Sequence, residues 1–224
     1  MPKSVIDHGR RLICVGALSA SILGSEMPCG AQRSSDEAAS AAHLRNECRL
    51  ISQVLRTSNP SPRREWALLR APGCADEGAP VLAQLWNTVP AAGPDLEQLM
   101  RTSMRLRDGR LYSHLLRVAA EPHVQPEIRV AAMLVLAKYV NPGNGVYLAQ
   151  LVPPDTIRYV RMATGSTNHR SSFDGSVPLP AGYGRNVLTV LERLAGDRAH
   201  QPRAVWYAAE MLRQRVEFDL GLRR

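Results

Sequence analysis

The chain has 224 residues, of which 45% are hydrophobic and only 5% aromatic. This length fits one domain with or without a tail, and the scarcity of aromatic residues leaves Leu, Val, Ala and Met to form the core. The net charge of +8 comes from arginines that are spread along the chain, whereas a nucleic-acid binder would gather them in a stripe. We therefore expect most arginines on solvated helix faces, with an anionic partner as the alternative.

The amino-terminal segment has the pattern of a targeting signal. Basic residues occur among the first eleven positions, an apolar run follows at 12–24, and small and polar residues extend to Ala31. These are the three parts of a secretory signal peptide, so we predict that residues 1–31 are a leader cleaved after Ala31. Cleavage after Gly24 or Ser25 is an alternative. The apolar run is too short to span a bilayer, which disfavours an uncleaved anchor.

An exported mature chain changes the interpretation of the cysteines. Cys14 and Cys29 leave with the leader, and Cys48 and Cys74 remain. An even pair of cysteines in an exported protein predicts one disulfide, here between Cys48 and Cys74. Closing the loop between them stabilises the fold by roughly 3 kcal/mol in the chain-entropy model. Export to the periplasm or the cell exterior is therefore the expected localisation, without a transmembrane segment in the mature protein.

Beyond a flexible segment at 32–36, apolar residues recur at spacings of three and four, which predicts amphipathic helices. Pro- and Gly-rich turns separate the helical stretches. We predict an all-α fold of about eight short helices in stacked antiparallel hairpins, forming a single domain at 37–216 before a frayed tail at 217–224. The expected helices lie at 37–56, 63–69, 78–89, 94–106, 110–120, 126–140, 185–195 and 202–216.

The stretch 126–140 is expected to be the central helix. Pro126 suits a first helical position, and Glu127 places a negative charge at the positive end of the helix dipole. Every residue from 130 to 137 is apolar, and a helix that is apolar nearly all round is buried on most sides.

A long loop is expected at 153–184, where Gly, Pro and Ser are frequent. A loop of this length in a compact domain is often functional. Its part at 165–175 carries His169, Ser171, Ser172 and Asp174, which are nominally a base, two nucleophiles and an orienting acid. An envelope hydrolase using this loop is the alternative function, although residues so close in sequence rarely adopt triad geometry.

Three helical stretches begin alike, at Pro62, Pro126 and Pro202. The segment that starts at Pro126, Pro-Glu-Ile-Arg-Val-Ala-Ala-Met-Leu-Val-Leu, resembles the second helix of a HEAT-like repeat. The resemblance extends over about 61–216, and an irregular helical bundle is the alternative. It implies a scaffold that binds other proteins along stacked helices, and it implies no catalytic residues.

No zinc-ligand spacing, phosphate-binding loop, dinucleotide fingerprint or nucleophile elbow occurs in the sequence. We therefore expect no cofactor, no metal site and no catalytic residue. The leading hypothesis is an exported, non-enzymatic helical interaction protein whose partner is another protein of the cell envelope. Electrostatic binding to an anionic polymer or membrane surface is a further hypothesis, motivated by the arginines. The sequence indicates no oligomeric state.

Overall fold

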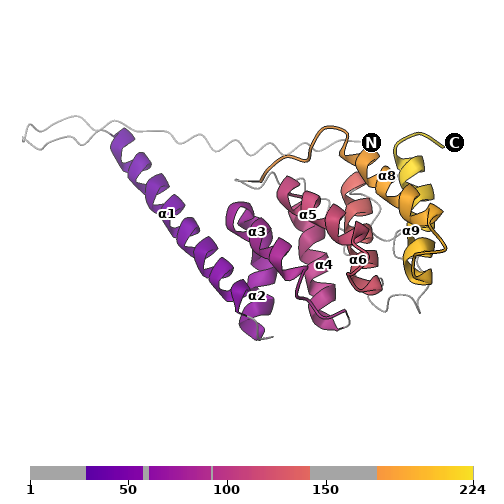
Figure 1. Cartoon of the computed structure of the whole chain (residues 1–224). Helices are drawn as coiled ribbons and strands as arrows, with labels where there is room; N and C mark the ends of the chain where they lie inside the picture. The colour runs from indigo at the N-terminus through magenta and orange to yellow at the C-terminus, as the bar shows by residue number, and fades with distance from the viewer. Residues whose placement is uncertain (1–28, 58–60, 92, 142–175, 224) are drawn as a thin grey trace, which may run out of the picture. The chain divides into compact units, whose positions relative to one another are not determined.

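The structure of the protein is a computed structural model that describes residues 29–57, 61–91, 93–141 and 176–223. These residues form eight α-helices and one 3-10 turn and contain no strand, which confirms the all-α prediction (Figure 1). The helices are α1 (Cys29–Arg56), α2 (Pro62–Arg70), α3 (Ala75–Leu85), α4 (Pro94–Leu106), α5 (Gly109–Ala120), α6 (Pro126–Val140), α8 (Tyr183–Gly196) and α9 (Arg203–Asp219), with the turn η1 (Ala71–Gly73) after α2.

The contacts divide the chain into two units, residues 1–40 and residues 41–224. Helix α1 continues from the first unit into the second, and its residues from Ala41 onward belong to the second. Most of the predicted leader, residues 1–28, lies outside the described residues. Residues 32–36, which we expected to be flexible, belong to α1, and this helix is longer than the short helices that the sequence suggested.

Proline and capping residues start several helices where the sequence predicts. Pro62, Pro94 and Pro126 lie in the first turns of α2, α4 and α6. A proline there costs no hydrogen bond, because N–H groups in the first turn have no partner within the helix. The hydroxyl of Ser61 accepts a hydrogen bond from the backbone N–H of Arg64 at 3.2 Å and caps α2. The bounds of α6 coincide with the predicted 126–140.

Helix α3 lies about three residues before its predicted position. Asp76 and Glu77 belong to its first turn, where the positive end of the helix dipole stabilises carboxylates. The helix ends at Leu85 because the next turn tightens: the N–H groups of Asn87 and Thr88 bond to carbonyls only three residues back.

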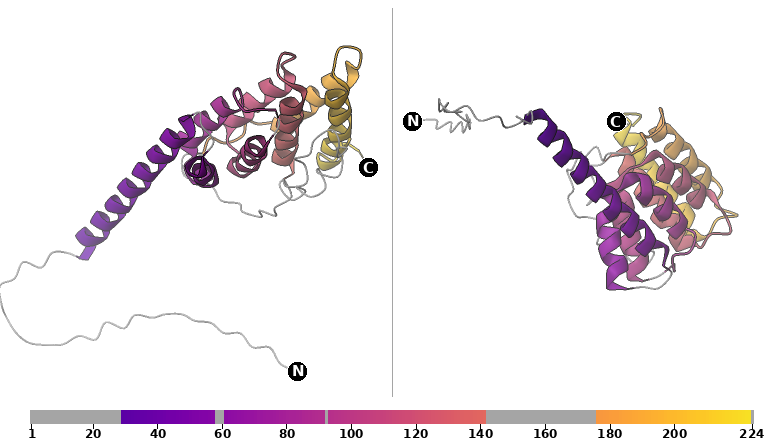
Figure 2. Two further views of the ribbon diagram at one scale, coloured as in Figure 1. Left: turned by 90° about the horizontal axis from the view of Figure 1, so that it is seen from below. Right: turned by 90° about the vertical axis from the view of Figure 1, so that its left-hand side faces the viewer.

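Helix α6 is the centre of the core. Its side chains from Ile128 to Tyr139 are all buried, and it packs against α4, α5, α8 and α9. The pairs α5–α6 and α8–α9 lie side by side in Figures 1 and 2. The contacts of α8 with α9 are the most extensive, followed equally by those of α6 with α5 and of α6 with α9. The pair α8–α9 is antiparallel, because Gly184 at the start of α8 faces Leu220 just beyond the end of α9.

Two arginines do not lie on solvated faces, contrary to our general expectation. Arg64 on α2 and Arg129 on α6 are both buried. The Nε of Arg129 donates to the carbonyl oxygen of Ala119 at 3.0 Å, and its Nη2 donates to Oε1 of Gln201 at 2.8 Å. Desolvation by burial lowers the pKa of Arg129. This side chain joins the end of α5 to the connection between α8 and α9.

The last part of the predicted 153–184 loop is anchored at the start of α5. Residues 142–175 lie outside the described residues, and α8 begins at Tyr183, inside the expected loop. The N–H of Val177 donates to Oδ2 of Asp108 at 2.8 Å, and the N–H of Gly109 donates to the carbonyl oxygen of Val177 at 2.7 Å. The segment that precedes α8 is therefore paired with the α4–α5 turn.

The prediction of a frayed tail at 217–224 is wrong for residues 217–219, because α9 extends to Asp219. Oδ1 of Asp219 accepts a hydrogen bond from Nδ2 of Asn141 at 2.9 Å and lies 2.9 Å from Nη2 of Arg215. Leu220 packs against the core. These contacts hold the helical conformation beyond Val216, where the apolar periodicity of the sequence ends.

Candidate functional site

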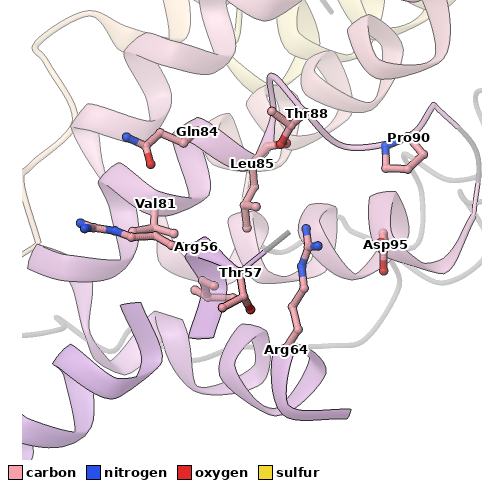
Figure 3. A pocket seen from close by; sticks show the side chains of 10 residues that line it. Arg56, Thr57, Arg64, Val81, Gln84, Leu85, Thr88, Pro90 and Asp95 are labelled. Carbon is pink, nitrogen blue, oxygen red and sulfur yellow. The ribbon is translucent and has the colours of Figure 1, made fainter. Parts of the chain in front are cut away.

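A pocket with a volume of about 440 Å³ lies where the end of α1 meets α2, α3 and the start of α4 (Figure 3). All of it belongs to the unit formed by residues 41–224. Ten residues line the pocket: Leu55, Arg56, Thr57, Arg64, Val81, Gln84, Leu85, Thr88, Pro90 and Asp95. This volume falls within the range of about 300–1,000 Å³ that is usual for ligand-binding clefts.

The pocket has an apolar floor and a polar rim. Leu55, Val81 and Leu85 are buried and form the floor. The rim contains exposed Gln84 and Thr88, which can donate and accept hydrogen bonds. A concave apolar surface bordered by a few polar groups suits a ligand or a partner side chain that is apolar at its centre.

Two arginines bring positive charge to the pocket. Arg64 comes from α2 and is only 8% exposed, and Arg56 comes from the exposed end of α1. Figure 3 shows the Arg64 side chain extending from α2 toward the space beside Leu85, with the guanidinium of Arg56 beyond Val81 on the other side. The single acidic residue among the lining side chains is Asp95, in the first turn of α4.

A disulfide holds the α1 wall of the pocket in place. The sulfur atoms of Cys48 and Cys74 lie 2.05 Å apart, with a Cα–Cα distance of 5.3 Å across a sequence separation of 26, which confirms the predicted pair. Ile51 and Leu55 follow Cys48 on the same face of α1 and are buried. Glu47, next to Cys48, pairs with Arg70 of α2 at 3.3 Å. The bond therefore ties the last turns of α1 to the start of α3.

The buried Arg64 was missed by the sequence analysis, although a signal for it exists. Ser61 and Pro62 define the start of α2, so Arg64 lies three and four residues before Ala67 and Leu68. Residues at these spacings share a helix face, and Ala67 and Leu68 are both buried. The general expectation of solvated arginines did not take this helix face into account, and it holds for exposed Arg63 but not for Arg64.

The polar cluster considered for hydrolysis, His169, Ser171, Ser172 and Asp174, lies outside the described residues. Among the described histidines, His200 pairs with Asp197 through Nδ1 at 2.6 Å on an exposed turn. Desolvation lowers the pKa of half-buried His114, which lies beside Arg117. Neither histidine lines the pocket. Across the described ranges, no three His, Cys, Asp or Glu side chains gather as a metal site would require.

No protein-family model, curated protein or solved structure matches this chain. Among the helices that the structure describes, none combines the length and the apolar character needed to cross a bilayer.

Proposed function

We propose that this chain is an exported, non-enzymatic interaction protein that docks a protein of the cell envelope in the pocket at the end of α1. The observation that carries the proposal is a hollow of about 440 Å³ with a buried apolar floor beneath an exposed polar rim. Such a hollow accepts an apolar side chain of a partner and excludes water around it, as the central pockets of protein interfaces do.

Export is supported by the leader-like pattern of residues 1–31 and by the cysteine pair. A disulfide persists in oxidising compartments such as the periplasm or the cell exterior. The pairing of Cys48 with Cys74 therefore agrees with an exported protein.

The helical hairpins support a scaffold role. Hairpins such as α5–α6 and α8–α9 are the units from which HEAT-like scaffolds are built, and such scaffolds bind partners along their helix surfaces. A single pocket of this size would anchor an interface at the small end of the range for proteins, so the complex is expected to form and dissociate readily.

Site-specific crosslinking in the exporting cell tests the proposal. A photo-activated amino acid replaces Gln84 or Thr88 on the rim, and Glu192, exposed on α8, serves as the matched control. We expect a discrete crosslinked product from the two rim positions and none from position 192. Equal products from all three positions, or no product from the rim, would contradict docking at the pocket.

The compartment is tested separately, by intact mass of the protein recovered from that cell. We expect the mass of residues 32–224 with two hydrogens fewer than the dithiol form. A full-length mass with four thiols open to alkylation would contradict both export and the disulfide.

A further inference from the structure

We infer that the pocket recognises a short acidic segment of a protein, in which one apolar side chain lies between two carboxylates. This inference rests on the proposed docking function and specifies the chemistry of the partner. It follows from the order of the groups along the pocket, from the burial of Arg64 and from the charge of the whole chain.

The order of the groups supplies the pattern. In Figure 3, Val81 and Leu85 lie between the guanidinium of Arg56 on one side and that of Arg64 on the other. A segment that lies across the pocket thus meets a cation, an apolar floor and a second cation in turn. The complementary segment has an acidic residue, an apolar residue and an acidic residue in the same order.

The position of Arg64 strengthens recognition of a carboxylate. Its guanidinium extends beside the apolar floor in Figure 3, and the residue is only 8% exposed to water. Charge-assisted hydrogen bonds are stronger there than on an open surface, because the surrounding dielectric constant is lower. A guanidinium also presents a planar fork that matches both oxygens of a carboxylate, which an ammonium group does not.

Asp95 limits how far the acidic pattern extends. It lies beyond Arg64 in Figure 3, at the start of α4, and would repel a further carboxylate of the bound segment. Residues 32–224 hold 25 of the 28 basic and 18 of the 20 acidic side chains, and this net positive charge accelerates encounter with an acidic partner at low ionic strength. A segment with two acidic residues, rather than a long acidic run, therefore fits this pocket.

The test uses the exported, oxidised protein and three short fluorescein-labelled peptides of equal length, followed by fluorescence anisotropy. The peptides contain Glu-Leu-Glu, Gln-Leu-Gln or Glu-Ser-Glu between Gly-Ser flanks. We expect Glu-Leu-Glu to bind at least about tenfold more tightly than either of the others, the size of effect that loss of one charge-assisted bond produces. Its affinity should fall as salt is raised.

Variants assign the effect to the two arginines. Arg56→Gln and Arg64→Gln should each weaken Glu-Leu-Glu about tenfold without changing Gln-Leu-Gln, while Arg63→Gln, exposed on the same helix, should change neither. Because Arg64→Gln alters a buried position, its melting temperature is measured as well. Arg64→Lys, which keeps the charge but loses the fork, should still weaken Glu-Leu-Glu.

The outcomes separate this inference from the proposed function. Equal binding of Glu-Leu-Glu and Gln-Leu-Gln would overturn the acidic specificity. So would Glu-Leu-Glu binding that is unchanged in both single variants, Arg56→Gln and Arg64→Lys. In either case a crosslinked product from Gln84 would still support docking at the pocket. Absence of binding by all three peptides would also overturn it. Arginine-dependent binding to vesicles of anionic lipid, stronger than binding to Glu-Leu-Glu, would assign these side chains to a membrane surface instead.

Discussion

Asp108 and Val177 are separated by 69 positions, yet the backbone N–H of Val177 donates to the carboxylate of Asp108 at 2.8 Å. The same carboxylate accepts from the backbone N–H of Arg110 at 2.8 Å and from its guanidinium at 3.0 and 2.9 Å. Arg110 in turn donates to the carbonyl oxygen of Ala75. One fully buried acid thus joins the starts of α3 and α5 to the segment that precedes α8.

Removing this acid should destabilise the fold. Asp108→Ala deletes the cap of α5 and removes the acceptor of the N–H of Val177 and of two N–H groups of the Arg110 guanidinium. We expect the free energy of unfolding to fall by about 3 kcal/mol. Asp108→Asn is the matched variant: it keeps the shape and one accepting oxygen, but its amide nitrogen cannot accept the remaining hydrogen bonds, so it should recover only part of this loss. Urea unfolding followed by circular dichroism measures both, and an Ala variant as stable as the parent would contradict the assigned role.

Acid should weaken the fold over a definite range. Burial acts to raise the pKa of Asp108, but hydrogen bonds from Arg110 and Val177 outweigh it and hold the pKa below its usual 3.8. Hydrogen bonds from Arg213 and Gln214 lower the pKa of Glu210 from 4.5 to about 2. Both groups are more acidic when folded, so the stability they contribute is complete above about pH 5 and is lost as pH falls toward 2.

The measurement for this prediction is the free energy of unfolding between pH 6 and 2, with pH values set about one unit apart. Combining Asp108→Asn with Glu210→Gln should flatten the decline, whereas Glu192→Gln on the exposed face of α8 should leave it unchanged. A decline of the same steepness in the double variant would show that other carboxylates cause it.

Gly109 must lack a side chain for the returning segment to fit. A Cβ at this position would lie 2.4 Å from the carbonyl oxygen of Pro178, closer than any real contact. Gly109→Ala should therefore displace the segment around Val177 and cost about 1–3 kcal/mol. Gly196→Ala is the control, since open space surrounds its Cβ position. Thermal melting and limited proteolysis near Pro178 test the pair, and equal behaviour would refute the steric argument.

Ser103 of α4 connects two aromatic side chains. Its hydroxyl accepts from Nε1 of Trp86 at 3.0 Å, and its carbonyl oxygen accepts from the hydroxyl of Tyr139 at 2.8 Å. Ser103→Ala leaves the buried indole N–H without an acceptor and should cost about 1–3 kcal/mol. Trp86→Phe should cost more, because it also removes packing. In a double-mutant cycle the two losses should be less than additive, and strict additivity would argue against the bond.

Loss of the disulfide should lower stability and loosen the pocket together. Cys48→Ser with Cys74→Ser should cost about 3 kcal/mol, the value for a closed loop of this size. Because Leu55 and Arg56 lie on the helix that the bond anchors, affinity for the Glu-Leu-Glu peptide should fall as well. Adding reductant to the parent should reproduce both losses, and the double variant should not respond to it. If the reduced parent binds the peptide with unaltered affinity, the disulfide does not contribute to the shape of the pocket.

The sequence predicted the elements whose formation depends on local pattern. Helix α6 has the expected bounds, because Pro126 favours a helix start and because the apolar run that follows it is long enough to form a buried helix. The pair Cys48–Cys74 followed from the count of cysteines left after the leader. In each case the information lies within a few residues or in simple arithmetic.

What the sequence did not reveal depends on distant partners. The bond between Asp108 and Val177 joins residues 69 positions apart, and no pattern near Asp108 in the sequence indicates it. The extension of α9 to Asp219 depends on Asn141, which is far away in sequence. The pocket combines side chains from four helices, and no local pattern marks such a combination.

Because α6 packs against α4 and α5 and also against α8 and α9, it joins the helices that precede it to the last hairpin. In modular repeat arrays a terminal unit can be gained or lost during evolution, since each unit contacts only its neighbours. Here deletion of the last hairpin would expose a helix with almost no polar face. The amides of α6 should exchange with solvent only through global unfolding, and truncation before α8 should yield an aggregating fragment rather than a smaller scaffold.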